Sequence, residues 1–248
     1  MHRFFIRETD IEGQLIAISG SDAKHIREVL RMKPGDKLEL VSELWVYSCE
    51  ITQSDRSKVE ALILSRNNKI NEPKLSISLY QGLPKSAKME YILQKCTEIG
   101  VKRFCPVITV RSVVRITDIK KEEKKLDRWR QVLEESAKQS MRDIVPELTN
   151  ILKFEDMLKD LEGKTILVPY EEEEERTLTE FFREHKGSDN LAIVIGPEGG
   201  FEETEIERLK DAGAEVVTLG RRILRTETAG LVVASICLFE HGDLGVIK

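Results

Sequence analysis

The hydrophobic pattern of the chain changes after Lys74, and this change limits the folds that the chain can adopt. From there on, short apolar segments alternate with amphipathic segments of roughly ten to twenty residues. Such a pattern is typical of a mostly parallel sheet that is covered by helices on both faces. We expect strands at 75–80, 103–110, 165–169, 191–195 and 215–219, and helices near 86–99, 121–141, 203–212 and 227–240.

The first seventy residues show a different pattern, in which apolar and polar residues alternate. A period of two is typical of strands with one buried face, and it marks segments 15–18, 37–41, 45–49 and 59–64. One helix interrupts these strands. Ser21 or Asp22 is its expected cap, and Ile26, Val29 and Leu30 are expected on one face. Together these elements predict a small β-barrel with one helix.

The stretch 67–74 is polar, contains Pro73 and has no apolar periodicity. We place the boundary between two domains there. The sequence therefore predicts an α/β protein with a β-barrel domain over 1–70 and a larger domain over 74–248.

Charge is distributed unevenly along the 248 residues, of which 40% are hydrophobic and whose net charge is -5. Residues 1–70 carry 11 basic and 11 acidic side chains, residues 71–150 carry 16 and 11, and residues 151–248 carry 12 and 22. The net charge argues against a generally basic nucleic-acid binder. The basic middle third fits either an anionic partner that touches one face or an ordinary solvated helix.

Several protein classes are not supported by the sequence. Cys49, Cys96, Cys105 and Cys237 show no C-x-x-C spacing, and no histidines lie four apart beside a glutamate, so we expect neither a metal site nor disulfides. The start has no apolar h-region, and the longest apolar run, 229–239, is too short to span a membrane. We expect a cytosolic protein without a membrane segment.

Two unusual loops follow predicted strands. One is Gly196-Pro197-Glu198-Gly199-Gly200-Phe201, and the other runs from Gly220 to Ala229 and opens the last helix, which Thr226 is expected to cap. Ligands bind beyond the carboxyl ends of strands in open parallel sheets. Three glycines let a ligand approach the main chain, although a purely structural turn is the alternative. The run of five glutamates, 171–175, is expected to be a solvated loop, and we assign it no role.

Neither loop has the spacing of a phosphate cradle, G-x-x-x-x-G-K-[ST] or G-x-G-x-x-G. A ligand held by backbone groups and by apolar walls suits an adenine ring, and S-adenosylmethionine fits that description. The expected cofactor-binding residues are Leu167, Pro169, Ile195, Gly196, Pro197, Gly199, Gly200, Leu219, Gly220, Ile223, Leu224, Arg225, Thr226 and Ala229.

Several segments resemble those of one enzyme family. GPEGGF, the following Glu205-Ile206 and LGRRILRTETA resemble the C-terminal signature of the knotted SPOUT methyltransferases. The upstream segments resemble the RsmE family in the same order, and the resemblance covers essentially the whole chain. They are HIREVLR at 25–31, QGLPK at 81–85, Met89-Glu90, KCTEIGV at 95–101 and the stretch from Arg128-Trp129 to Gln139. One departure is Met141, where the family has a small residue before the arginine.

The resemblance implies a PUA-like N-terminal barrel, a trefoil knot around the cofactor and a homodimer. It also implies methylation of uracil N3 in 16S ribosomal RNA, with the small ribosomal subunit as partner. Two alternatives stay open. One is ribose 2'-O methylation of RNA by the same fold, and the other is a ribosome-assembly protein that binds RNA without catalysis.

Methyl transfer to N3 needs a group that accepts a proton and a cation that stabilises the anion. The candidate cations are Arg225 and Arg142, and either could instead form an ordinary ion pair. The candidate bases are Glu198 and Glu227, and each could instead cap a backbone amide. The candidate phosphate ligands, which would position RNA without specifying its sequence, are Arg3, Arg7, Lys24, Arg27, Arg31, Lys85, Lys88 and Arg111.

Overall fold

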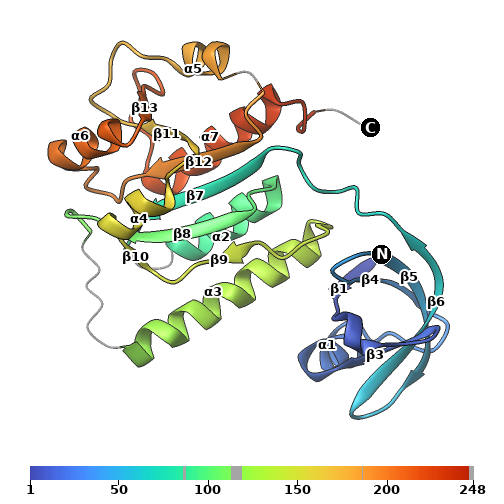
Figure 1. Cartoon of the computed structure of the whole chain (residues 1–248). Helices are drawn as coiled ribbons and strands as arrows, with labels where there is room; N and C mark the ends of the chain where they lie inside the picture. Colours follow the sequence, from blue (N-terminus) through green and yellow to red (C-terminus); the bar gives the residue numbers. More distant parts are fainter. Residues whose placement is uncertain (86–87, 113–118, 186, 246–248) are drawn as a thin grey trace. The chain divides into compact units, whose positions relative to one another are not determined.

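The computed structural model describes residues 1–85, 88–112, 119–185 and 187–245. The chain forms two compact units (Figure 1): unit 1 contains Met1–Glu72 and Ala137–Ile144, and unit 2 contains Pro73–Ser136 and Val145–Lys248. The chain leaves unit 1 within the linker that the sequence indicates. It returns to unit 1 at Ala137–Ile144, residues that the predicted continuous boundaries, 1–70 and 74–248, assign to the larger domain.

Unit 1 is a six-stranded sheet that curves around its apolar core (Figure 1), with the strand order β1-β4-β5-β6-β3-β2. Strands β1 and β4 are parallel, and the other pairs are antiparallel. The four strands predicted from alternation are confirmed. The bounds are β1 His2–Phe5, β2 Ile11–Glu12, β3 Leu15–Ser19, β4 Lys37–Val41, β5 Val46–Ser54 and β6 Lys58–Asn67, with a 3-10 turn at Glu8–Asp10.

The helical segment of unit 1 differs from the prediction in its cap and in its buried face. Helix α1, Gly20–Lys24, begins after Ser19, and a π-helical turn, His25–Val29, follows it. Because that turn is wider than an α-helical one, Ile26 is fully buried whereas Val29 is 67% exposed. Asp22 is not the cap; its carboxylate forms an ion pair with Lys138, 2.7 Å away.

A buried carboxylate joins Ala137–Ile144 to the rest of unit 1. The side chain of Asp143 is 1% exposed, and its Oδ1 accepts a hydrogen bond of 2.6 Å from Nη1 of Arg3. Its Oδ2 accepts the backbone N–H groups of Ile70 and Asn71, at 2.8 and 2.7 Å. One side chain thus connects the first strand, the linker and the end of helix α3.

Met141 has a backbone φ of 59°, in the left-handed region. A non-glycine residue is destabilised there by about 1–2 kcal/mol because its Cβ approaches a carbonyl oxygen. We expect Met141→Gly to raise the free energy of unfolding by about 1 kcal/mol, measured by urea denaturation. As a control, Gln139→Gly places glycine at the end of helix α3 and is expected to destabilise by up to about 1 kcal/mol. Equal effects of the two changes would contradict this interpretation.

Unit 2 contains a parallel sheet with the strand order β10-β8-β7-β12-β11-β13, and β9 also pairs with β8. Its strand pairs within the described residues are parallel, in agreement with the mostly parallel sheet that the sequence predicts. The bounds are β7 Ser76–Gly82, β8 Arg103–Ile108, β9 Glu147–Leu148, β10 Leu152–Lys153, β11 Thr165–Pro169, β12 Asn190–Ile195 and β13 Ala214–Val217. The order is not sequential, because β12 lies between β7 and β11.

Helices cover both faces of this sheet (Figure 1). Alternate residues of β12 point to opposite faces: Ile193 packs with helices α2, α3, α5 and α7, and Val194 packs with α4 and α6. The bounds are α2 Lys88–Ile99, α3 Ile119–Gln139, α4 Phe154–Asp160, α5 Leu178–Glu184, α6 Glu203–Asp211 and α7 Thr226–Glu240. The four predicted helices are confirmed, and residues 86–87 of the first lie outside the described residues. Helices α4 and α5 were not predicted.

Candidate cofactor site

A cavity of about 900 Å³ lies where three adjacent strands of unit 2 end. Its walls come from the segments that follow β11, β12 and β13, and from the first residue of α2. The carboxyl ends of parallel strands meet at one edge of a sheet, so this is the place where an open α/β sheet binds ligands. The volume lies within the range of about 300–1,000 Å³ that is usual for small-molecule sites.

Most of the predicted cofactor residues line this cavity. The structure brings together Pro169, Ile195, Gly196, Pro197, Gly200, Leu219, Gly220, Ile223, Leu224, Arg225, Thr226 and Ala229. Leu167 does not line it, because its side chain lies in the apolar core of the sheet. Gly199 is not among the lining residues either, and its carbonyl oxygen accepts a hydrogen bond from Arg111.

The loop after β12 is held in a fixed shape. Gly200 has a φ of 69°, in the left-handed region where a side chain is strained, so this turn favours glycine. The buried carboxylate of Glu205 accepts the N–H of Glu202 and the N–H of Val110, each at 3.0 Å. These bonds fix the end of the loop where helix α6 begins.

Thr226 connects the two cofactor loops and does not cap helix α7. Arg225 occupies the N-cap position, without a side-chain capping bond. The hydroxyl of Thr226 instead donates to the carbonyl oxygen of Gly196 at 2.6 Å and accepts from Nε2 of Gln81 at 2.8 Å. Gln81 was not predicted as a site residue, since its contacts depend on strand β7 lying beside β12.

Lys88 bridges the two carboxylates that were predicted as candidate bases. Its Nζ lies 3.2 Å from Glu198 and 3.1 Å from Glu227. Burial opposes ionisation of both glutamates, but bonds from backbone N–H groups and from Lys88 outweigh it and lower both pKa values. The same ion pairs, led by Glu227, raise the pKa of Lys88. All three groups are therefore charged at neutral pH, and both carboxylates are weak bases.

Three arginines of the loop after β13 contribute to the cavity wall: Arg221, Arg222 and Arg225. All three are exposed. Within the described part of the chain, no hydrogen bond or ion pair engages their guanidinium groups. Arg221 and Arg222 were not predicted as site residues. These cations are available to an anion from outside the protein.

The acidic run 171–175 forms a loop, as predicted, but it also has a place in the site. Glu171, Glu173 and Glu174 line the cavity. The carboxylate of Glu173 accepts the backbone N–H groups of Glu175 and Arg176, which lower its pKa. The cavity wall therefore carries carboxylates as well as the arginines of the loop after β13.

Arg142, a predicted catalytic cation, belongs to unit 1 and not to the cavity lining. Its side chain is 3% exposed, and Nη2 lies 2.6 Å from the carboxylate of Glu72. Oε1 of Glu72 also accepts the N–H of Asp143 at 3.0 Å. The geometry favours the alternative interpretation of Arg142, an ordinary ion pair that holds Ala137–Ile144.

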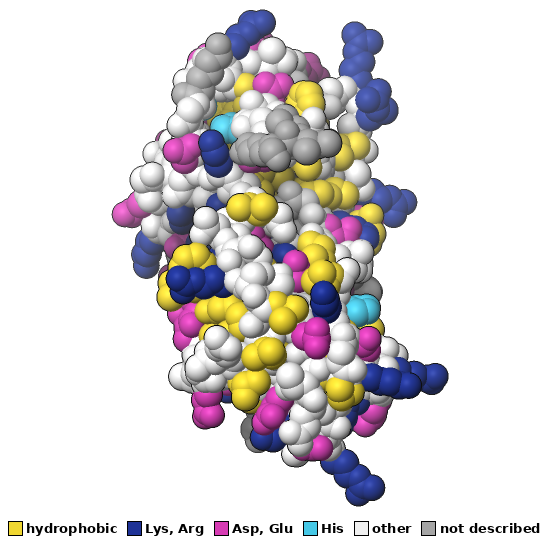
Figure 2. Space-filling model, turned by 90° about the vertical axis from the view of Figure 1, so that its right-hand side faces the viewer, with side chains coloured by type: hydrophobic (Ala, Val, Ile, Leu, Met, Phe, Trp, Pro, Cys, Tyr) yellow, Lys and Arg dark blue, Asp and Glu magenta, His cyan; other side chains and the backbone are white. Residues whose placement is uncertain are grey.

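The candidate phosphate ligands differ in availability. Arg3 is buried, and Arg111 is held by Glu202 and by the carbonyl of Gly199, so neither is free for a phosphate. Arg27 donates to the carbonyl oxygen of Asp55. The exposed candidates are Arg7, Lys24, Arg31 and Lys85. On the face in Figure 2, lysine and arginine side chains extend singly, with acidic side chains between them.

Among the described residues, no three or more His, Cys, Asp and Glu side chains gather in a way that could hold a metal ion. No helix among them is both long enough and apolar enough to cross a bilayer.

Comparisons with known proteins identify the family. A family of RNA methyltransferase domains matches residues 71–238, and a family of RNA methyltransferase PUA domains matches residues 18–64. Ribosomal RNA small subunit methyltransferase E from Bacillus subtilis is 36% identical over 97% of each chain. The enzyme of that name from Aquifex aeolicus is 32% identical over 96% of this chain and 99% of the relative. This chain belongs to the ribosomal RNA small subunit methyltransferase E family.

A solved structure supports the assignment to the methyltransferase E family. The methyltransferase E from Neisseria gonorrhoeae, which was crystallised bound to S-adenosyl methionine, superposes with a TM-score of 0.86. It is 29% identical and covers 96% of this chain and 97% of its own. The predicted PUA-like domain and SPOUT methyltransferase domain are thereby confirmed, whereas the trefoil knot and the homodimer stay predictions.

Proposed function

We propose that this chain is an S-adenosylmethionine-dependent methyltransferase that methylates N3 of a uridine in 16S ribosomal RNA. The observation that carries the proposal is the cavity at the ends of β11, β12 and β13, in a chain whose relative from Neisseria gonorrhoeae was crystallised with that cofactor. Exposed backbone, apolar side chains and carboxylates line the cavity, which suits an adenosine group that carries a sulfonium and an ammonium.

When bound, S-adenosylmethionine supplies an electrophilic methyl group. The protein must place N3 in line with that group, and such positioning can contribute roughly 7–11 kcal/mol. Thr226 holds the two loops together, which fixes the wall against which both reactants would lie. Arg225, whose guanidinium forms no hydrogen bond or ion pair within the described part of the chain, would stabilise the charge that N3 and its neighbouring carbonyl oxygens carry after N3 loses its proton.

The geometry does not favour either of the two glutamates that the sequence suggests as the proton acceptor. Glu198 and Glu227 were candidate bases, but both are ion-paired with Lys88 and ionised, with lowered pKa values. A carboxylate with a lowered pKa accepts a proton poorly. We propose that the N3 proton passes to water, while the cations of the site lower the cost of forming the anion.

Two measurements test the proposed function. Calorimetry should give a dissociation constant near micromolar for S-adenosylmethionine, about -8 kcal/mol. After reaction with 16S ribosomal RNA, reverse transcriptase should stop at the modified uridine, because a methyl at N3 blocks the pairing face. Cofactor binding and methylation with read-through would favour ribose 2'-O methylation. No heat with millimolar cofactor would favour an RNA-binding protein without catalysis.

Arg221 and Arg222 are the best-placed phosphate ligands beside the cavity, because both are exposed and unpaired within the described residues. Each phosphate contact to single-stranded RNA changes the slope of log K against log salt by about 0.7. We expect the double replacement by alanine to reduce that slope by about 1.4, measured by filter binding between 50 and about 300 mM salt.

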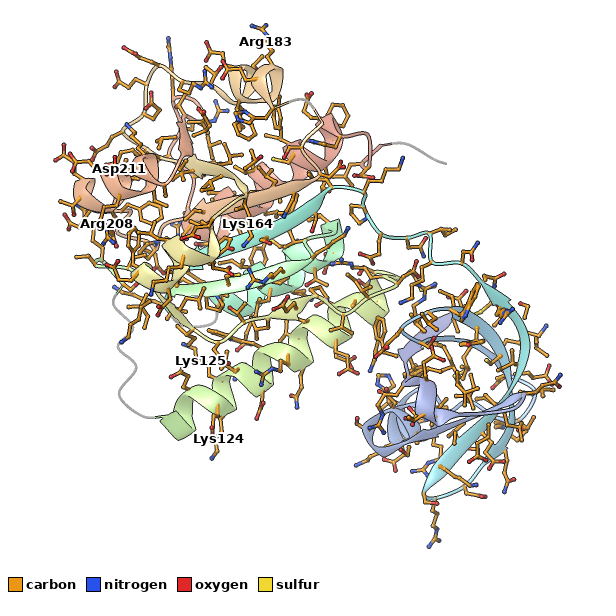
Figure 3. The ribbon with its side chains drawn as sticks, in the orientation of Figure 1. Lys124, Lys125, Lys164, Arg183, Arg208 and Asp211 are labelled. Carbon is orange, nitrogen blue, oxygen red and sulfur yellow. The ribbon has the colours of Figure 1, made fainter. Side chains whose placement is uncertain are left out.

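Arg208 provides the matched control for this test. It lies on α6 (Figure 3), and both of its terminal nitrogens contact the carboxylate of Glu155. Because its charge is already neutralised, Arg208→Ala should leave the slope within about 0.3 of the wild-type value. A double variant with the wild-type slope would remove Arg221 and Arg222 from the RNA site.

The predicted homodimer, the assembled small subunit as substrate and a cytosolic location belong to the same proposal. The family resemblance implies the first two, and the third is the expectation from the hydrophobic pattern of the sequence. Light scattering coupled to size-exclusion chromatography would test the dimer, and activity on naked RNA against isolated small subunits would test the substrate.

A further inference from the structure

Lys88 occupies an unusual position at the wall of the cavity. It is the first residue of helix α2, and its ammonium lies between Glu198 of the loop after β12 and Glu227 of the first turn of α7. The positive end of a helix dipole disfavours a cation at this position. The two carboxylates offset that cost, so the ammonium is fixed by groups from two separate cofactor loops.

This arrangement does not suit the role of phosphate ligand that the sequence suggested for Lys88. A phosphate that approaches this ammonium also approaches Glu198 and Glu227, which repel it at close range. A ligand group that is neutral when it binds, and that carries only part of a unit charge during the reaction, meets less of that repulsion than a phosphate does. A carbonyl oxygen of a nucleobase is such a group.

The number of donors on Lys88 points the same way. An ammonium carries three N–H groups. The carboxylates of Glu198 and Glu227 lie at ion-pair distance and can engage at most one group each, so at least one N–H group is left within the described part of the chain. The side chain is 30% exposed, and Lys88 lines the cavity together with Arg225. The remaining donor is therefore accessible from the cavity.

We propose that Lys88 is a catalytic residue that donates this third N–H to a carbonyl oxygen beside N3 of the bound uracil. The inference rests on the proposed function. Uracil N3 lies between two carbonyl groups, so the anion shares its charge over two oxygens. Arg225 and Lys88 are two cations on the cavity wall, one for each oxygen.

The bonds and charges of this step balance. The N3–H bond breaks and its proton passes to water, while the electron pair stays on the ring and spreads onto both carbonyl oxygens. The N3–CH₃ bond then forms as the S–CH₃ bond breaks, and the electron pair of that bond returns to sulfur as a neutral thioether. Lys88 remains protonated throughout and only stabilises negative charge.

Lys88→Met removes the charge and keeps most of the side-chain volume. Under single-turnover conditions with saturating cofactor, we expect the methylation rate to fall by about 10²–10³-fold, the usual loss of one preorganised donor. The rate should also reach its plateau at a higher pH than in the wild type, because the uracil proton becomes harder to remove. Cofactor affinity, measured by calorimetry, should change by less than about threefold. The pH profile separates this role from a purely structural one.

Lys95→Met is the matched control. Lys95 lies on the same helix, and its ammonium pairs with Glu98 three residues away and does not line the cavity. We expect its methylation rate to stay within about twofold of the wild-type rate. If Lys88→Met matches this control in rate and in pH profile, the proposal is wrong.

RNA that carries 5-fluorouridine gives a second test, since fluorine makes the N3 proton more acidic. It should restore much of the lost rate to Lys88→Met and help the wild type far less. Equal gains in both proteins would overturn the role of Lys88. Should Lys88→Met fail to fold, the gain in rate with 5-fluorouridine can be compared between the wild type and Lys88→Gln. That variant keeps an N–H donor without the charge. If the wild-type protein itself does not methylate either RNA, the proposed function fails instead.

Discussion

Gly82→Ala is expected to weaken cofactor binding by about 5- to 150-fold. Gly82 ends strand β7, and a Cβ at this position would lie 2.6 Å from both the nitrogen and Cδ of Pro197, and 2.9 Å from the carbonyl carbon of Gly196. These atoms belong to the loop that forms one wall of the cavity, so the added methyl group must displace that loop. Overpacking of this kind costs about 1–3 kcal/mol, which corresponds to the stated loss.

Calorimetry with S-adenosylmethionine measures the effect, and Gly230→Ala controls for the added methyl group. Gly230 lies within helix α7, and a Cβ there would meet only side-chain carbons of Leu79 and Ile195, at 3.4 Å or more. Alanine is favoured over glycine inside a helix by about 0.5–1 kcal/mol. Gly230→Ala should therefore keep the affinity and raise the stability slightly. Wild-type affinity in Gly82→Ala would show that the cavity wall tolerates displacement.

Asp143→Ala is expected to lower the free energy of unfolding by about 3–5 kcal/mol. The change leaves the buried guanidinium of Arg3, 4% exposed in its side chain, without its closest carboxylate at 2.6 Å. It also leaves the N–H groups of Ile70 and Asn71 without the acceptor that Asp143 supplies. Breaking a buried pair costs this much because the remaining charge stays buried, although Glu39 still contacts Arg3 and moderates the loss.

Urea denaturation measures this loss, and Asp127→Ala is the control. Asp127 pairs with Arg130 on the surface of α3, where its side chain is 68% exposed. Exposed pairs contribute little, so we expect a change within about 0.5 kcal/mol. If Asp143→Ala were equally mild, the return of the chain to unit 1 would not depend on this carboxylate.

The sequence predicts the sheet of unit 2 well, because its strands are apolar runs between polar residues. The predicted strand at 165–169 coincides with β11, and the predicted strand at 191–195 differs from β12 by one residue. Elements with weaker patterns were missed. Strand β1 has four residues, too few for a clear alternation, and α4 and α5 have seven each. The π-helical turn at His25–Val29 altered the buried face because its period differs from 3.6.

In the site, too, features set by local sequence were predicted and features set by distant contacts were not. Glycine-rich loops after strands predicted most of the cavity wall, because their residue types depend on local backbone requirements. The roles of charged side chains depended on partners far along the chain. Arg142 was predicted as a catalytic cation and Lys88 as a phosphate ligand, and only the fold reveals the carboxylates beside them. Glu72 pairs with Arg142, and Glu198 and Glu227 pair with Lys88. The acidic loop 171–175 was given no role from the sequence, because only the fold shows that it lines the cavity.

The division of unit 1 between two stretches of sequence affects when this unit can fold during synthesis. Arg3 leaves the ribosome well before Asp143, which follows 140 positions later. The intervening residues 73–136 take several seconds to translate at about 5–20 residues per second. During that interval the nascent sheet of unit 1 lacks Asp143, one of the two carboxylates that contact Arg3. The PUA-like unit, although most of it precedes the methyltransferase domain, is therefore completed only after part of that domain has been made.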